Sequence, residues 1–170
     1  FPQLVAGPIV RAAELIPQLY KPYSFTQYQF GLALFCILKG LTKKVIIGDY
    51  IAVNFIDRVF GNPMMYTCFE NLMALYGYSL QVYADFSGYT DIAIGIALLM
   101  GFTLPTNFNS PYKAKNVGEF WKRWHISLST WLRDYLYIPL GGNRGGSLIT
   151  YRNLMLTMLL GGLWHGASWN

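Results

Sequence analysis

Two histidines, the only ones in the chain, lie in apolar, tryptophan-rich surroundings. Each directly follows a tryptophan: His125 within residues 121–129 and His165 within residues 161–169. An imidazole can take up and return a proton near neutral pH, so a histidine in an apolar setting is expected where chemistry needs it. We therefore predict both histidines to be catalytic.

Structural roles are the alternatives. His165 could be held by a backbone carbonyl at a helix end, and His125 could turn its polar edge to water, as interfacial aromatic residues do. A zinc site is not expected, because the two histidines are forty positions apart and no thiol pair completes a tetrahedron. Ser168 lacks the GxSxG context of a nucleophile, so direct transfer assisted by histidine is the simpler hypothesis.

The composition is typical of a membrane protein. The chain is 54% hydrophobic, 17% aromatic and 12% charged, whereas soluble domains carry roughly 25% charged residues. The net charge of +5 suits anionic lipid headgroups. No dense basic tract is present, so we expect no nucleic-acid partner.

The apolar runs predict an all-α chain. Residues 25–38 and 45–60 are expected to form helices separated by the basic segment 39–44. Residues 72–104 would extend about 50 Å as one helix, longer than a membrane core of about 30 Å. We therefore expect this run to bend or divide at residues 85–91, where polar groups and a glycine interrupt it.

Two aspartates lie in this interruption. Asp85 is a candidate to bind a polar substrate or to move protons, but both Asp85 and Asp91 are also candidates to cap the expected break. Residues 1–22 contain four prolines, which predicts an irregular segment with at most short helices.

The histidine segments have their own helix signals. Asn116 followed by Glu119 resembles a capping box and predicts a helix starting at Val117. From Trp121 to Tyr135 the apolar residues recur with helical spacing, which predicts one continuous face. That face would include Trp124, His125 and Trp131. Residues 141–146 are expected to turn, and residues 148–164 to form a last helix that ends beside His165.

Four segments together carry a family resemblance. They read FPQLVAGPI (1–9), YADFSGYTDIA (83–93), FWKRWHISLS (120–129) and GGLWHGA (161–167). In order and spacing they resemble the membrane-bound O-acyltransferase (MBOAT) family, most closely its bacterial branch of alginate O-acetylation subunits and teichoic acid D-alanyl transfer proteins. The resemblance extends over essentially the whole chain.

The resemblance implies a polytopic, multi-helix membrane fold with a funnel, in a bacterial cytoplasmic (inner) membrane. It implies transfer of an acyl group, expected to be acetyl, from an intracellular acyl thioester such as acetyl-CoA toward hydroxyls of an extracytoplasmic polysaccharide. His165 matches the central histidine of the family and His125 its second motif histidine. Trp124, Trp164 and Trp131 would shape the funnel. The thioester is expected as a co-substrate, with no bound cofactor and no metal.

Residues 1–170 are interpreted as an internal fragment of one membrane-embedded domain. The expected partners are membrane lipid and a polysaccharide acceptor, reached through extracytoplasmic acyltransferase proteins. Two other functions stay open: a non-catalytic membrane channel or transporter component for an acyl carrier, and a structural subunit that docks a soluble acyltransferase.

Overall fold

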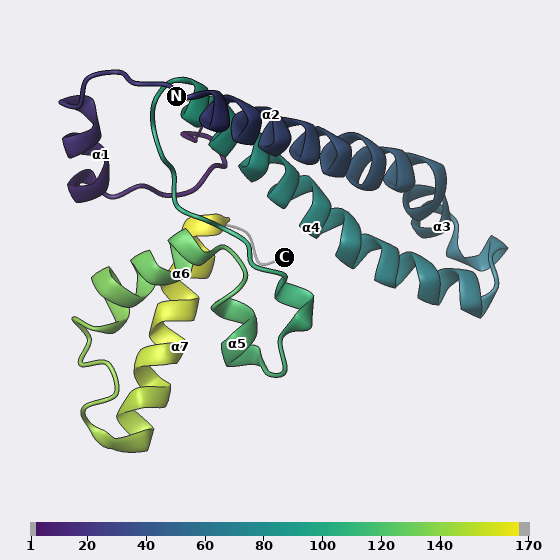
Figure 1. Cartoon of the computed structure of the whole chain (residues 1–170). Helices are drawn as coiled ribbons and strands as arrows, with labels where there is room; N and C mark the ends of the chain where they lie inside the picture. Colours follow the sequence, from purple (N-terminus) through teal and green to yellow (C-terminus); the bar gives the residue numbers. More distant parts are fainter. Residues whose placement is uncertain (1–2, 167–170) are drawn as a thin grey trace. The chain divides into compact units, whose positions relative to one another are not determined.

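The computed structural model describes residues 3–166, which form helices and loops with no strand in that range. The all-helical prediction is therefore confirmed for these residues. The chain comprises two compact units, Phe1–Asn107 and Phe108–Asn170. In chain order (Figure 1) the elements are α1 (Ala12–Leu19), α2 (Gln27–Leu41), η1 (Thr42–Tyr50), η2 (Ala52–Ile56), α3 (Asp57–Gly61), η3 (Pro63–Met65), α4 (Cys68–Leu99), η4 (Pro111–Lys113), α5 (Val117–Trp121), α6 (Ile126–Leu132), η5 (Arg133–Tyr137) and α7 (Gly146–His165).

The first unit is built on a helical hairpin. One arm runs from α2 through the wide π-helical turns of η1 and η2 into α3, and the other arm is α4. Both arms begin with complete capping boxes: Thr26 with Gln29, and Thr67 with Glu70. In each box the threonine hydroxyl accepts from the backbone amide three residues on, which satisfies a donor that the first helical turn leaves unpaired.

The predicted break at residues 39–44 is wrong, because the helix continues through it in π-helical form. The predicted division at residues 85–91 is also wrong, since α4 is a single helix of 32 residues. Both errors have one physical reason: the two polar interruptions pair with each other. Lys39 Nζ and Lys43 Nζ lie 3.0 and 2.8 Å from the Asp91 carboxylate oxygens.

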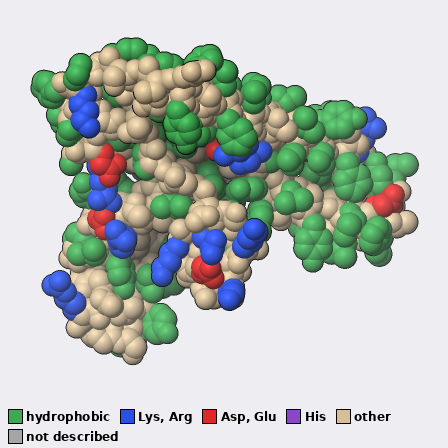
Figure 2. Space-filling view, in the orientation of Figure 1, with side chains coloured by type: hydrophobic (Ala, Val, Ile, Leu, Met, Phe, Trp, Pro, Cys, Tyr) green, Lys and Arg blue, Asp and Glu red, His purple; other side chains and the backbone are tan. Residues whose placement is uncertain are grey.

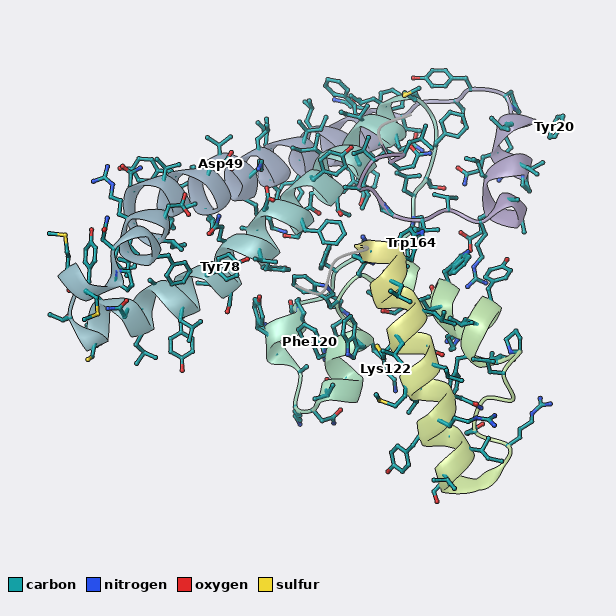
Figure 3. All side chains as sticks on the ribbon, turned by 180° about the vertical axis from the view of Figure 1, so that it is seen from behind. Tyr20, Asp49, Tyr78, Phe120, Lys122 and Trp164 are labelled. Atoms are coloured by element: carbon teal, nitrogen blue, oxygen red, sulfur yellow. The ribbon has the colours of Figure 1, made fainter. Side chains whose placement is uncertain are left out.

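Asp85 and Asp91 therefore cap no break. Lys44 Nζ forms ion pairs with Asp85 on α4 and with Asp49 on its own arm. Asp49 follows Lys44 by five positions, a spacing that a π-helical turn brings onto one face. Asp49 lies on the arm that runs alongside α4 (Figure 3).

Glycines let the two arms approach closely at the level of these charges. A Cβ atom on Gly40 would lie 2.5 Å from the Gly88 carbonyl oxygen, and one on Gly95 would lie 2.7 Å from the Ala33 carbonyl oxygen. Contacts this close are possible only because Gly40 and Gly95 have no Cβ atom.

The helix α4 ends earlier than the expected Leu104. Gly101 adopts φ +85°, its amide donates to Leu98 O, and the Phe102 amide donates to Ala97 O at 2.8 Å. This pair of bonds is the Schellman arrangement that stops a helix at a left-handed glycine. The region before α2 contains only the short helix α1, which confirms the prediction for residues 1–22 within the described range. Gln18 joins this region to Thr103 through hydrogen bonds in both directions.

The hairpin exposes many large apolar side chains, and Figure 2 shows hydrophobic groups spread over it. Phe35, Phe69 and Tyr76 are among those more than 60% exposed. By length and composition, one described helix, α4, could cross a membrane. The membrane character predicted from composition is thus visible in this unit, whereas the polytopic arrangement stays a prediction.

The second unit contains η4, α5, α6, η5 and α7. Asn116 caps α5 as predicted, because its Oδ1 accepts from the Glu119 amide at 2.8 Å. The predicted continuous face from Trp121 to Tyr135 is wrong, since α5 ends at Trp121 and a turn precedes α6. The glycine-rich turn at 141–146 and the last helix are confirmed, although α7 starts at Gly146.

Candidate active site

The topology of the second unit brings its two histidines together. His125 immediately precedes α6, and His165 is the last residue of α7. The turn at 141–146 reverses the chain between these helices, and Figure 1 shows them side by side. The start of one helix thus lies near the end of the other. The His125 and His165 ring centroids are 6.5 Å apart, with the ring planes at 73°.

Two contacts hold α7 in place, one against α6 and one against the turn that precedes α7. A Cβ atom on Gly161 would lie 3.3 Å from Leu132 Cδ1, so the glycine allows close packing there. At the other end, the buried Asn153 donates from Nδ2 to Gly142 O at 2.9 Å. The backbone at Gly142 has φ +55°, a left-handed conformation that glycine adopts readily.

The backbone at His125 is strained. Its φ of 44° and ψ of 55° lie in the left-handed region, which is uncommon for a residue other than glycine. Such residues concentrate at functional sites, where the surrounding structure imposes the conformation. The His125 carbonyl accepts from the Ser129 amide at 2.9 Å, which starts α6.

The two imidazoles have different environments. His125 is 8% exposed, whereas His165 is exposed at the helix end. Burial, with a smaller contribution from His165, lowers the pKa of His125 to about 4. A histidine with this pKa is neutral at physiological pH, so its ring can accept or donate a hydrogen bond without carrying charge. The exposed ring of His165 is open to an incoming group.

Trp124 belongs to an aromatic cluster. Its ring centroid lies 5.1 Å from that of Phe108 and 5.6 Å from that of Phe120, and Tyr112 lies 6.4 Å away. These contacts pack α5 against the loop that precedes it. They give Trp124 a structural role, and its predicted place in a binding wall stays a prediction.

The other predicted tryptophans differ in placement. Trp164 lies in the last turn of α7 (Figure 3), 68% exposed, with its ring centroid 5.0 Å from that of His165. Trp131 lies on α6, 40% exposed, and contacts Tyr135 at 5.3 Å between centroids. The structure therefore brings Trp164 to the histidine pair, whereas the contact recorded for Trp131 is with Tyr135.

Asp85 lies in the first unit, where Lys44 pairs with it. Its predicted role in substrate binding stays a prediction. Within residues 3–166, no group of three or more histidine, cysteine or acidic side chains is placed to hold a metal ion. Ser168, which we did not expect to be a nucleophile, lies outside the described residues, as do Phe1, Pro2 and Ala167 of the quoted motifs.

One set of site residues was missed from the sequence. Arg123 donates from Nε and Nη2 to Glu119 Oε1 at 3.0 and 2.7 Å, and from Nη1 to Asn109 O at 3.2 Å. The spacing of Glu119 and Arg123 predicts an i,i+4 pair on a helix. The bond to Asn109 has no sequence signal, because it joins positions fourteen residues apart through a loop.

The MBOAT family model, described as the membrane-bound O-acyltransferase family, matches residues 1–170. The chain belongs to this family. The resemblance seen in the four sequence motifs is thereby confirmed. Of these motifs, the second MBOAT segment contains the aspartates of the hairpin, and the last two contain the histidine pair.

Named relatives share this region. A peptidoglycan O-acetyltransferase of Helicobacter pylori is 52% identical over 171 residues, covering 99% of this chain and 32% of the relative. A probable alginate O-acetylase AlgI of Pseudomonas aeruginosa is 50% identical with the same coverage. A teichoic acid D-alanyltransferase of Bacillus subtilis is 34% identical over 183 residues, covering 99% of this chain and 45% of the relative.

This MBOAT chain therefore spans about a third of the length of the two O-acetylating relatives. The three names refer to three different polymers: peptidoglycan, alginate and teichoic acid. Both histidines lie in the part that is shared, since the similarity covers 99% of the chain in each case.

Proposed function

We propose that the protein containing this chain is an O-acyltransferase of the bacterial inner membrane. It would transfer an acyl group, most simply acetyl, from an intracellular thioester such as acetyl-CoA toward hydroxyls of an extracytoplasmic polysaccharide. The observation that carries the proposal is the meeting of the two motif histidines at 6.5 Å. The names of the relatives support an acetyl group and a polymer acceptor.

His165 acts as the general base in this proposal. The acceptor hydroxyl oxygen attacks the thioester carbonyl carbon while His165 takes the hydroxyl proton. The new C–O bond forms, the C–S bond breaks, and the leaving thiolate receives the proton from the His165 imidazolium. No covalent enzyme intermediate is needed.

His125 orients or polarises one of the reactants. Its neutral ring is held close to His165 by a strained backbone, so it can hydrogen-bond the acceptor hydroxyl or the thioester carbonyl. Trp164 would line the approach to His165. Trp124, Trp131 and Asp85 remain proposed contributors to the substrate path, and the thioester is a co-substrate rather than a bound cofactor.

The remaining parts of the proposal concern the whole protein. A multi-pass membrane setting is supported by the exposed apolar surface of the hairpin and by α4. Membrane lipid and extracytoplasmic acyltransferase proteins are the proposed partners, the latter delivering the group to the polymer. Nucleic acid is not a proposed partner.

A channel or transporter component is the second candidate, and one observation favours it. The hairpin holds Lys39, Lys43, Lys44, Asp85 and Asp91 within its apolar surroundings, and ionisable groups at membrane depth often line polar paths. These five side chains form ion pairs between the two arms, however, which is the arrangement expected of groups that stabilise the hairpin.

The test uses cells in which the intact gene is deleted and then restored. Mass spectrometry of the cell-surface polymer should show acylation with the wild-type protein and none with His165→Ala or His165→Gln, at equal amounts of membrane-inserted protein. Glutamine keeps a polar path but cannot shuttle the proton. Wild-type acylation with His165→Gln would favour the transport function and reject His165 as the base.

A further inference from the structure

A hydrogen-bonded clamp lies two residues before His125. Arg123 and Asn109 are joined twice: the Asn109 amide donates to the Arg123 carbonyl oxygen at 2.9 Å, and Arg123 Nη1 donates to Asn109 O at 3.2 Å. The loop before α5 is thereby fixed to the turn after α5. We call Asn109, Glu119 and Arg123 the clamp. It joins the two ends of the segment 109–123, which directly precedes His125 in the sequence.

Glu119 completes the clamp. Its Oε1 accepts both remaining guanidinium bonds, and its Oε2 accepts from the Lys115 amide at 2.9 Å. The hydrogen bond from the Lys115 backbone, and then that from Arg123, lower the pKa of Glu119, so the carboxylate stays charged at neutral pH. Charged hydrogen bonds in a fork geometry fix direction as well as distance.

The clamp lies between two strained residues. Ser110, with φ 47°, follows Asn109, and His125, with φ 44°, follows Arg123 by two positions. Within residues 3–166 these are the two non-glycine residues with positive φ. Left-handed backbone at such residues persists only when its surroundings impose it, and the clamp joins the segments on which both lie.

The arginine of the clamp is less exposed than the arginine of another ion pair in the same unit. The Arg123 and Glu119 side chains are 28% and 29% exposed, whereas in the Arg133–Asp134 pair the arginine is 58% and the aspartate 23% exposed. Figure 2 shows that other basic side chains gather around α5. Arg123 donates three hydrogen bonds to protein groups, two to Glu119 Oε1 and one to Asn109 O.

We infer that Arg123 is a positioning residue: through Glu119 and Asn109 it holds the strained turn that directs the His125 ring toward His165. This inference rests on the proposed function and assigns to it a residue that touches neither reactant. Misplacement of a reacting group by about 1 Å can lower a rate by about 100-fold, so loss of the clamp should be visible in kcat.

The experiment uses the full-length protein in vesicles, with an acyl thioester and a polysaccharide acceptor. Arg123→Gln should lower kcat by about 10- to 100-fold with little change in KM, because binding groups remain while the ring is displaced. Arg123→Lys should restore little of this loss, since a lysine cannot form the fork. Arg133→Gln is the matched control, and its kcat should equal that of the wild type.

Two further measurements separate positioning from general stability. In a His125→Ala protein, Arg123→Gln should cause no additional loss, because the two changes act through one ring. Diethyl pyrocarbonate, which acylates neutral imidazole, should modify His125 faster in Arg123→Gln than in the wild type, as read by peptide mass spectrometry. This second readout applies even when residual activity is too low to measure.

The outcomes are distinguishable. Wild-type kcat in Arg123→Gln, equal losses in Arg133→Gln, an additive loss in the His125→Ala protein, or unchanged His125 modification would each overturn the positioning role. Wild-type activity in His165→Ala would instead reject the proposed function. Loss of activity in His165→Ala, with full activity in Arg123→Gln, would reject only the role of Arg123.

Discussion

At the scale of single residues, the histidine pair combines one buried and one exposed imidazole. His125 is neutral because burial makes its charged form unfavourable, and His165 presents its ring at a helix end. The left-handed backbone of His125 shows that the fold imposes this placement. A pair in which one ring is fixed and the other accessible suits a reaction that needs one oriented hydrogen bond and one moving proton.

The lowered pKa of His125 predicts how stability depends on pH. Below about pH 6.5 the unfolded chain binds a proton at this position, whereas the folded chain does so only near pH 4. The His125 contribution to stability is therefore complete above pH 6.5 and is lost as pH falls toward 4, by about 3 kcal/mol at most.

Thermal unfolding of the full-length protein in detergent at pH 7, 6 and 5 measures this effect. His125→Asn is the comparison, because asparagine tolerates left-handed backbone and does not titrate. The loss of stability on acidification should be smaller in the variant. Equal pH dependence of the two proteins would contradict the burial of a neutral imidazole.

At the scale of elements, the helical hairpin depends on paired charges and close glycines. Asp91, 15% exposed at its side chain, receives two lysines, whereas Asp49 is 55% exposed. Asp91→Asn should lower the free energy of unfolding by about 1.5–3 kcal/mol, because two lysines lose their charged partner.

Asp49→Asn provides the control for that change. An exposed ion pair contributes about 0–1 kcal/mol, so its loss should be small. Denaturation of the two variants in detergent gives the comparison. A larger loss of unfolding free energy for Asp49→Asn than for Asp91→Asn would contradict the stabilising role given to the ion pairs of Asp91.

Glycine packing gives a second test of the hairpin. A Cβ atom on Gly88 would lie 2.8 Å from the Gly40 carbonyl oxygen, so Gly88→Ala must push the arms apart, at a cost of about 1–3 kcal/mol. Gly31, also helical, has no atom within 4 Å of such a Cβ. Gly31→Ala should therefore be neutral or raise stability by up to about 1 kcal/mol. Equal effects of the two changes on the unfolding midpoint would contradict the packing.

The two helix breaks were predicted wrongly because the charged residues concerned pair with partners more than forty positions away in the chain. Lysines in residues 39–44 and aspartates in residues 85–91 each interrupt an apolar run, and each was interpreted as a break. Only the meeting of the two arms shows that these interruptions neutralise one another. The start of α4 was placed too late, at residue 72 instead of Cys68, although Thr67 and Glu70 have the spacing of a capping box.

The same distinction applies to the site. The sequence identified both histidines by residue type and surroundings, and the glycine-rich turn implies that the helices on either side of it reverse. The left-handed backbone at His125 was not predicted, because it is uncommon for any residue other than glycine, although histidine adopts it more often than most, and no glycine marks the position. The helical periodicity from Trp121 onward therefore favoured a continuous helix that the structure interrupts.

At the scale of the whole molecule, we expect α4 to cross the membrane. Its 32 residues give about 48 Å of helix, enough to cross a core of about 30 Å and extend beyond it. Cys68 at its first turn is exposed, and Met100 at its end is 46% exposed. Labels at these two positions report on opposite ends of the helix.

Full-length protein in sealed vesicles, with every other cysteine replaced by serine, allows the measurement. A membrane-impermeant thiol reagent should reach Cys68 and an introduced Met100→Cys from opposite sides. Labelling of both positions from one side, in separately prepared single-cysteine proteins, would show that α4 does not cross.

The central claim is that the His165 imidazole removes the proton from the acceptor hydroxyl. It is tested most directly by the single-turnover rate of labelled acyl transfer, from a thioester to a polysaccharide, by the full-length protein in vesicles together with its extracytoplasmic partner proteins. General-base catalysis supplies about 10²- to 10⁴-fold, so His165→Ala should lower this rate by about that factor with thioester binding retained. A His165→Ala protein that transfers the label at the wild-type rate would contradict the account.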